Sequence, residues 1–187
     1  GYPQKRIAIH ESDANVFVPR FCQSLGKGDR AVLLLDPYST QLDWDTLKEV
    51  ARSEKVDLWL LFPISVLSRM TPKDGGKVQE SWRKTLNRLL GTDDWQGALY
   101  KPKTLPPMDD LFGHSYGDKE TERINVEELQ SWVNARLKEL FPYVAEPVPL
   151  RSNGSLLFLF YFVVSNPQPA AGALAKKVVS NILSKYR

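Results

Sequence analysis

Short apolar runs alternate with helix-like segments along the first third of the chain. Residues 6–11 (RIAIHE) have the pattern of a short strand, and residues 30–35 (RAVLLL) and 56–62 (VDLWLLF) are apolar with almost no polar alternation. Strands of the latter kind are typical of a parallel sheet that is covered on both faces by helices. The segments between them, 15–25 and 44–51, place apolar residues at helical spacing. This β-α-β-α-β pattern predicts parallel strands joined by right-handed crossovers.

The middle of the chain changes character. An amphipathic helix is predicted over residues 78–90, whereas residues 91–117 hold several glycines and prolines and predict little regular structure. Asn125 with a glutamate three residues later is a capping signal for a further helix, which should stop at Pro142. We therefore expect a helical and irregular insertion over residues 70–125.

The last third predicts a hairpin and a helix. Residues 148–151 and 156–165 are strand-like and flank Asn153-Gly154, the strongest short-range signal for a hairpin turn. Residues 170–186 follow as a helix with an apolar stripe. The whole chain is thus expected to be one α/β domain with a three-layer, doubly wound, mostly parallel sheet and a C-terminal β-hairpin and helix.

Composition narrows the class of protein. The chain has 187 residues, 42% of them hydrophobic and 25% charged, and a net charge of +3, which is the balance of a globular domain. A single cysteine, Cys22, excludes an internal disulfide and a multi-cysteine metal site. The longest apolar run, residues 156–164, is shorter than the ~18 residues that a membrane span needs. We expect a cytoplasmic protein with no membrane partner.

Candidate chemistry lies where the predicted strands end, because ligands of open α/β sheets bind beyond the carboxyl ends of the strands. A carboxylate there can accept a hydrogen bond from an amine, an aromatic ring can stack on a base, and an arginine can hold a phosphate. The residues at the three strand ends are Asp13 and Ala14, then Asp36, Pro37 and Tyr38, then Phe62, Pro63 and, slightly later, Arg69.

Each of these residues also has an ordinary structural interpretation. Asp13 can simply cap the helix over residues 15–25, Asp36-Pro37 can be a strand-to-turn device, and Arg69 can be a solvated cation. His114 lies in a polar stretch without a local ligand partner, so no metal site is predicted. The sequence contains no P-loop, no dinucleotide-binding glycine motif and no nucleophile elbow.

The run LLLDPYSTQLDWDTLKEVARSEKVDLWLLFPISVLSRM, the later LLGTDDWQGALY and the tail PLRSNGSLLFLFYFVVSNP resemble the three-Cys-motif partner family (TcmP). The resemblance covers nearly the whole chain from about Asp13 onward. It implies a bacterial or phage protein encoded beside a protein with a three-cysteine motif. It also implies a full-length form that resembles a class I methyltransferase and uses S-adenosylmethionine (SAM).

The same resemblance implies that the chain starts at the third strand of such a fold. The first two strands and the glycine loop that packs against SAM would then precede residues 6–11. A third strand without its neighbour has unpaired backbone groups, which are costly. We therefore expect an N-terminally incomplete domain, the alternative being a different strand order.

The resemblance also assigns roles to the candidate residues. Asp13 and Ala14 correspond to the position that faces the adenine of the cofactor. Asp36-Pro37-Tyr38 corresponds to the D-P-P-Y motif of amino-methyltransferases, in which the carboxylate orients the target amine and the aromatic stacks on a flipped base. One proline of that motif is absent here, and Ser39 stands where the family often has glycine. Independently of the resemblance, their position at the third strand end makes Phe62, Pro63 and Arg69 candidates for contacting the substrate, with Arg69 binding a phosphate.

Three functions remain open at this point. The leading hypothesis is a SAM-dependent methyltransferase-like protein that acts on nucleic acid. The alternative is a non-catalytic binding partner of nucleic acid or of the three-Cys-motif protein, which weak basic patches over residues 66–103 and 176–187 would suit. A nuclease is a weaker third option, because Asp13, Asp43 and Asp45 are a poor match for a metal cluster.

Overall fold

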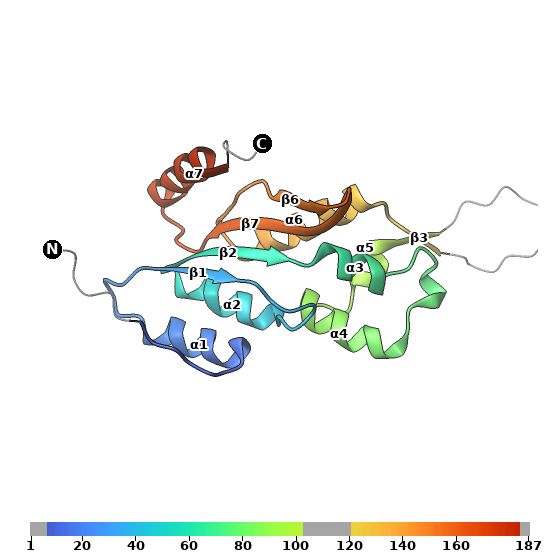
Figure 1. The fold of residues 1–187 in the computed structure, drawn as a ribbon, viewed down its shortest axis with the longest axis horizontal. Helices are drawn as coiled ribbons and strands as arrows, with labels where there is room; N and C mark the ends of the chain where they lie inside the picture. The colour runs from blue at the N-terminus through green and yellow to red at the C-terminus, as the bar shows by residue number, and fades with distance from the viewer. Residues whose placement is uncertain (1–6, 103–120, 184–187) are drawn as a thin grey trace, which may run out of the picture.

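A five-stranded mixed sheet carries the fold of the computed structural model, which describes residues 7–102 and 121–183 (Figure 1). The strand order is β1-β2-β7-β5, and β6 also pairs with β7. The strands are β1 (Ala31–Leu35), β2 (Val56–Phe62), β5 (Tyr143–Val144), β6 (Val148–Ser152) and β7 (Ser155–Val164).

Only one pair of this sheet, among the described residues, is parallel. β1 runs beside β2 in the register Ala31↔Val56, which confirms the predicted crossover through the intervening helix. β7 is antiparallel to β2, to β5 and to β6. The tight hairpin makes β6 and β7 antiparallel to each other, and β7 lies against β2 in the centre of the sheet. The α/β class is confirmed, and the sheet is mixed.

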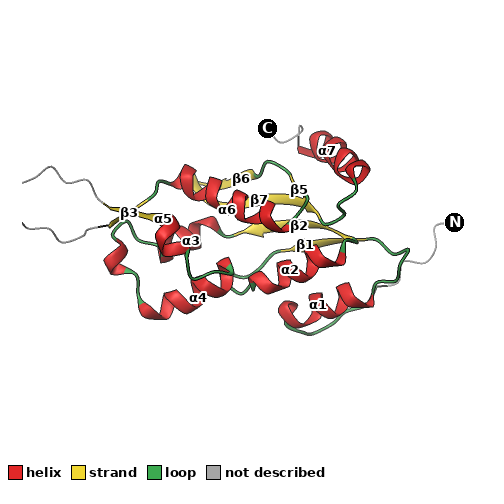
Figure 2. Cartoon of the chain, turned by 180° about the vertical axis from the view of Figure 1, so that it is seen from behind, coloured by secondary structure: helices red, strands yellow, loops and turns green. Residues whose placement is uncertain are grey.

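Helices cover the two faces of the sheet unequally (Figures 1 and 2). The helices are α1 (Ala14–Ser24), α2 (Trp44–Ser53), α3 (Ile64–Met70), α4 (Glu80–Leu90), α5 (Trp95–Leu99), α6 (Val126–Leu140) and α7 (Pro169–Leu183), with a short 3-10 turn at Gly75–Lys77. α7 lies apart from the others, on the far side of the sheet from α1 and α2. A three-layer, doubly wound arrangement stays a prediction.

The middle region is more regular than expected in its first part. α5 is followed by β3 (Tyr100–Pro102), which pairs antiparallel with β4 (Thr121–Arg123). The expectation of little regular structure over residues 91–117 is therefore wrong for residues 95–102, where Trp95 and Leu99 are fully buried and anchor the segment. Residues 103–117, which include His114, lie outside the described residues.

The main core lies between β2 and the helices. Side chains of Val56, Leu58, Leu60 and Phe62 point to this side of β2 and are all 0% exposed. They belong to one cluster with apolar residues of α2 and α6. A second, small cluster on the opposite face joins β7 to α7 through Ala145, Phe162, Val164, Ala175 and Val179.

Two strand predictions near the N-terminus need correction. β1 was expected to be covered on both faces, yet Val32 is 70% and Leu34 61% exposed on the face away from α2. Residues 7–11 form no strand, and Ile7 and Ile9 are almost fully exposed. The reason is the same in both cases: the described residues provide neither a pairing strand nor a covering layer at this edge of the sheet.

Local signals further along the chain are confirmed. Asn153 and Gly154 both have positive φ, 48° and 78°, as a two-residue hairpin turn requires. Asn125 caps α6 with Glu128 in a reciprocal capping box, at 2.8 and 3.0 Å. The helix ends at Leu140, and its C-cap Phe141 directly precedes Pro142.

Candidate functional site

A cleft of about 670 Å³ opens at the carboxyl end of β1. It combines the start of α1, the loop that follows β1 and one side chain of α4. Its lining residues are Ser12, Asp13, Ala14, Asn15, Leu35, Asp36, Pro37, Tyr38, Gln41, Leu42 and Arg88. Two of the three predicted strand-end groups are therefore brought together, as expected for segments that end at the same rim of a sheet.

Asn15 fixes the geometry of this cleft. Its side-chain amide donates to the carbonyl of Gln41 at 2.7 Å. Its Oδ1 accepts from the backbone N–H of Asp43 at 2.9 Å and from the hydroxyl of the buried Thr46 at 2.8 Å. One side chain thus ties α1 to the loop after β1 and to the start of α2. The sequence marked Asn15 only as the first residue of a helix, since its partners lie 26 or more residues away.

Asp13 acts as a helix cap. One carboxylate oxygen accepts the backbone N–H of Asn15 at 2.7 Å, and the residue is the N-cap of α1. The structural interpretation of Asp13 is therefore confirmed. This role does not exclude a ligand contact, because a carboxylate has a second oxygen and Asp13 is exposed in the cleft.

The loop after β1 presents its side chains outward. Asp36 is exposed, and Tyr38 is 81% exposed, a high value for an aromatic residue. Ser39 has a φ of 57°, in the left-handed region that favours glycine. A hydrogen bond from the N–H of Gln41 to the carbonyl of Tyr38, at 3.3 Å, completes the turn. Asp36 and Tyr38 are accessible to a ligand, with no rearrangement of the core.

The third predicted strand end, which follows β2, does not line the cleft. Phe62 is 0% exposed in the core, and Pro63 is buried at the start of α3. Arg69 is exposed on α3 and does not line the cleft. The physical reason is that α3 begins directly after β2 and turns the chain inward. Prediction from strand ends alone assumed a loop of the same kind after each strand.

Arg88 is a cleft residue that sequence reasoning missed. It extends from α4, where its Nε lies 3.1 Å from a carboxylate oxygen of Asp43 and its Nη2 donates to the carbonyl of Thr40 at 3.1 Å. These contacts hold a guanidinium beside the Asp36–Tyr38 loop. No local pattern could have identified Arg88, because only tertiary packing brings α4 next to the end of β1.

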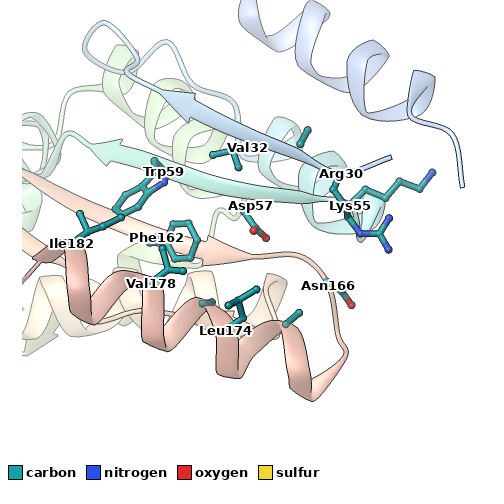
Figure 3. Close-up of a pocket in the computed structure, with 13 residues that line it drawn as sticks. Arg30, Val32, Lys55, Asp57, Trp59, Phe162, Asn166, Leu174, Val178 and Ile182 are labelled. Atoms are coloured by element: carbon teal, nitrogen blue, oxygen red, sulfur yellow. The ribbon is translucent and has the colours of Figure 1, made fainter. Parts of the chain in front are cut away.

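A second concavity lies on the open face of the sheet, between β1, β2 and α7 (Figure 3). Its volume is about 500 Å³. Trp59 and Phe162 form its floor, with ring centroids 4.5 Å apart, and exposed residues of α7 form its wall. Those wall residues are Leu174, Val178 and Ile182, which are 64%, 40% and 42% exposed. We call this concavity the α7 groove; it is mainly apolar.

Charged side chains lie at one end of the α7 groove (Figure 3). Burial raises the pKa of the Asp57 carboxyl above its ordinary value of 3.8, and the nearby Arg30 guanidinium offsets part of that rise. The ammonium of Lys55 donates to the carbonyl of Leu25 at 2.6 Å. The α7 groove therefore combines an apolar wall with a cationic end.

Comparisons with protein-family models, with curated proteins and with solved structures found no match to this chain. Within residues 7–102 and 121–183, no group of three His, Cys, Asp or Glu side chains could hold a metal ion. In the same residues no helix has the length and apolarity needed to cross a lipid bilayer.

Proposed function

We propose that this chain is a methyltransferase-like protein whose cleft at the end of β1 binds a nucleobase of a nucleic acid. The observation that carries the proposal is the exposure of Asp36 and Tyr38 together in one cleft with Asp13, at the carboxyl end of a parallel strand. This agrees with the D-P-Y motif and with the roles that the resemblance to the TcmP family implies.

The residues of the cleft suit an unstacked base. The carboxylate of Asp36 would accept a hydrogen bond from an exocyclic amine, and the ring of Tyr38 would stack on the base. Arg88 is better placed than Arg69 to attract a phosphate, because its guanidinium lines the cleft. Methyl transfer relies mainly on positioning, so these contacts would supply orientation rather than acid-base chemistry.

The cleft fits one end of the cofactor. When bound, SAM supplies the methyl group. Asp13 and Ala14 would hold its adenosine end, since the free carboxylate oxygen of Asp13 can accept from an amine or hydroxyl. None of the described residues that line the cleft is a glycine. The glycine loop that packs against SAM in the methyltransferase-like fold is therefore not among these residues.

Methyl transfer from radiolabelled SAM to DNA and RNA, measured with the native protein, tests the proposal. We expect Asp36→Ala and Tyr38→Ala each to lower the rate about 100-fold or more, and Tyr38→Phe to keep most of it, because the ring alone stacks. Asp93→Ala is the matched control, since Asp93 is exposed and lies outside the cleft. Unchanged turnover in Asp36→Ala would remove this residue from the site.

A second candidate function rests on the α7 groove. The exposed Leu174, Val178 and Ile182 form the kind of apolar surface that marks an interaction site. A non-catalytic partner of the three-Cys-motif protein would bind through such a surface. In that case Val178→Lys abolishes binding to that protein, whereas Asp36→Ala leaves it intact. Binding to nucleic acid without turnover, weakened steeply by salt, would favour a nucleic-acid partner instead.

A further inference from the structure

Asp43 occupies a helix cap position without capping the helix. It is the N-cap residue of α2, where an aspartate side chain usually accepts a backbone N–H, but its side chain makes no such bond. Its Oδ1 lies 3.1 Å from Nε of Arg88 instead. This oxygen is buried and accepts no well-aligned hydrogen bond from the described residues. The nearby guanidinium therefore offsets the desolvation of the carboxylate.

The backbone of Asp43 is fixed on both sides. Its N–H donates to Oδ1 of Asn15 at 2.9 Å, and its carbonyl accepts the N–H of Thr46 at 3.0 Å in the first turn of α2. The side chain of Asp43 is 32% exposed, against 49% for Arg88. An anchored carboxylate can hold a longer and more exposed side chain in one orientation, so Asp43 directs Arg88 rather than the reverse.

The contacts of Arg88 use one edge of its guanidinium. Nε lies beside Asp43, and Nη2 donates to the carbonyl of Thr40 at 3.1 Å. Nε–H and one N–H of Nη2 lie along the same edge of this planar group. The edge formed by Nη1 and the second N–H of Nη2 makes no hydrogen bond to the described residues. That edge has the fork geometry with which arginine binds two oxygens of a phosphate.

We propose that Asp43 is a positioning residue of the cleft, which orients Arg88 so that this second edge binds a phosphate of the nucleic acid backbone. This role rests on the proposed binding of nucleic acid in the cleft, which Arg88 lines. A phosphate contact positions a strand and carries no sequence information. Arg88 therefore adds affinity for any strand, whereas Asp36 and Tyr38 select the base.

The sign of one substitution distinguishes positioning from simple electrostatics. Removal of an acid beside a phosphate site ordinarily strengthens the binding of a polyanion. Asp43→Ala should weaken it, because Arg88 is then no longer held in the orientation that the phosphate needs. Asp93→Ala is the matched control, since Asp93 is exposed and lines, with Asp43 and Arg88, a neighbouring concavity of about 370 Å³. This control should leave binding unchanged or at most about twofold tighter.

Fluorescence anisotropy measures these affinities, with labelled single-stranded DNA and RNA of about 12 nucleotides at about 50 mM to about 200 mM KCl. We expect Arg88→Ala to weaken binding about tenfold and Asp43→Ala about fivefold. Each should also lower the slope of log affinity against log salt by about 0.7, the value of one phosphate contact. A merely structural role of Asp43 would not change that slope. Arg88→Lys keeps the charge but lacks the fork, so it should still weaken binding at least about threefold.

The double variant Asp43→Ala/Arg88→Ala should bind no more weakly than Arg88→Ala, because Asp43 acts through Arg88. Binding by Asp43→Ala that is as tight as in the parent, or tighter, would overturn the positioning role, as would full affinity of Arg88→Lys. If the parent binds neither strand in a salt-dependent manner, this role and the proposed nucleic-acid binding are both wrong. The expected affinities without any methyl transfer would contradict the proposed activity alone and support the role of Asp43.

Discussion

Asp57 is a carboxylate on a sheet face that is otherwise largely apolar. Burial raises its pKa, and Arg30 offsets the rise only in part. Because the folded-state pKa is above the unfolded value, the stability that this group contributes is fully present below the unfolded pKa. It is lost as the pH rises through the folded-state pKa. At neutral pH the folded protein therefore holds a partly desolvated charge.

We expect Asp57→Asn to raise the melting temperature at pH 7, because the amide removes that charge and keeps the shape of the side chain. The gain should shrink as the pH falls and vanish below about pH 4, where the parent carboxyl is also neutral. Thermal unfolding of both proteins across this range measures the effect. A variant that is less stable than the parent at pH 7 would show that the attraction between Asp57 and Arg30 outweighs the desolvation.

Gly91 ends α4 with a φ of 65°. A Cβ atom at this position would lie 2.1 Å from Cδ1 of Trp44, a side chain that is 2% exposed in the core. Gly91→Ala should thus lower the free energy of unfolding by about 3 kcal/mol or more, from the left-handed backbone and the overlap together.

Gly154→Ala is the matched control for this prediction. Gly154 has a φ of 78°, but no atom lies within 4 Å of its ideal Cβ position. Only the backbone cost remains, about 1 kcal/mol. Urea denaturation of both variants separates the cost of the left-handed backbone from the cost of the overlap with Trp44. Equal losses would mean that Trp44 moves aside at little cost.

At the scale of elements, the side chain of Asn15 holds three segments together: α1, the loop after β1 and the start of α2. Asn15→Ala removes three hydrogen bonds and leaves the hydroxyl of Thr46, which is 2% exposed, without its acceptor. We expect the free energy of unfolding, measured by urea denaturation, to fall by about 2–3 kcal/mol. Asn15→Asp keeps the acceptor but sets a carboxylate oxygen against the carbonyl of Gln41, so the stability that it loses measures this contact alone. If both variants cost the same, the donor to Gln41 dominates.

The elements also show where local signals are sufficient. The Asn153-Gly154 hairpin and the capping box of α6 were predicted correctly, because the residues that form each motif are near neighbours in the sequence. The strand predicted over residues 6–11 is absent from residues 7–11, because a strand requires a partner that its own sequence does not specify. α5 and β3 were missed within a segment rich in glycine and proline, where burial of Trp95 outweighs weak local propensity.

At the scale of the whole molecule, the two faces of the sheet are held by cores of very different size. The large core joins β2 to α2 and α6, whereas α7 is attached through the small cluster that contains Ala175 and Val179. The local stability of a segment falls with the apolar area that it buries. α7 should accordingly open more readily than the rest of the domain.

Hydrogen exchange with mass spectrometry measures this difference. Amides of α7 should exchange well before those of β2 and of α6, in which Leu129 and Leu137 are 0% exposed. Val179→Ala should accelerate exchange in α7 and leave α6 unchanged, since the two helices belong to different clusters. Equal protection of α7 and α6 would indicate that the α7 groove is covered in solution.

The sequence by itself determined the α/β class, the parallel pair of β1 and β2 with α2 between them, and the C-terminal hairpin and helix. It also determined that Asp36 and Tyr38 follow a strand end. These features depend on side-chain periodicity and turn chemistry, which act over a few residues.

Tertiary structure alone decided what surrounds those elements. It placed Arg88 and Asn15 at the cleft. It buried Phe62 and Pro63 in the interior. It also left Val32 and Leu34 exposed. An apolar run specifies that burial is favourable, because the hydrophobic effect is proportional to area and has no direction. It does not specify which element provides the burial, and the described residues leave one face of β1 exposed.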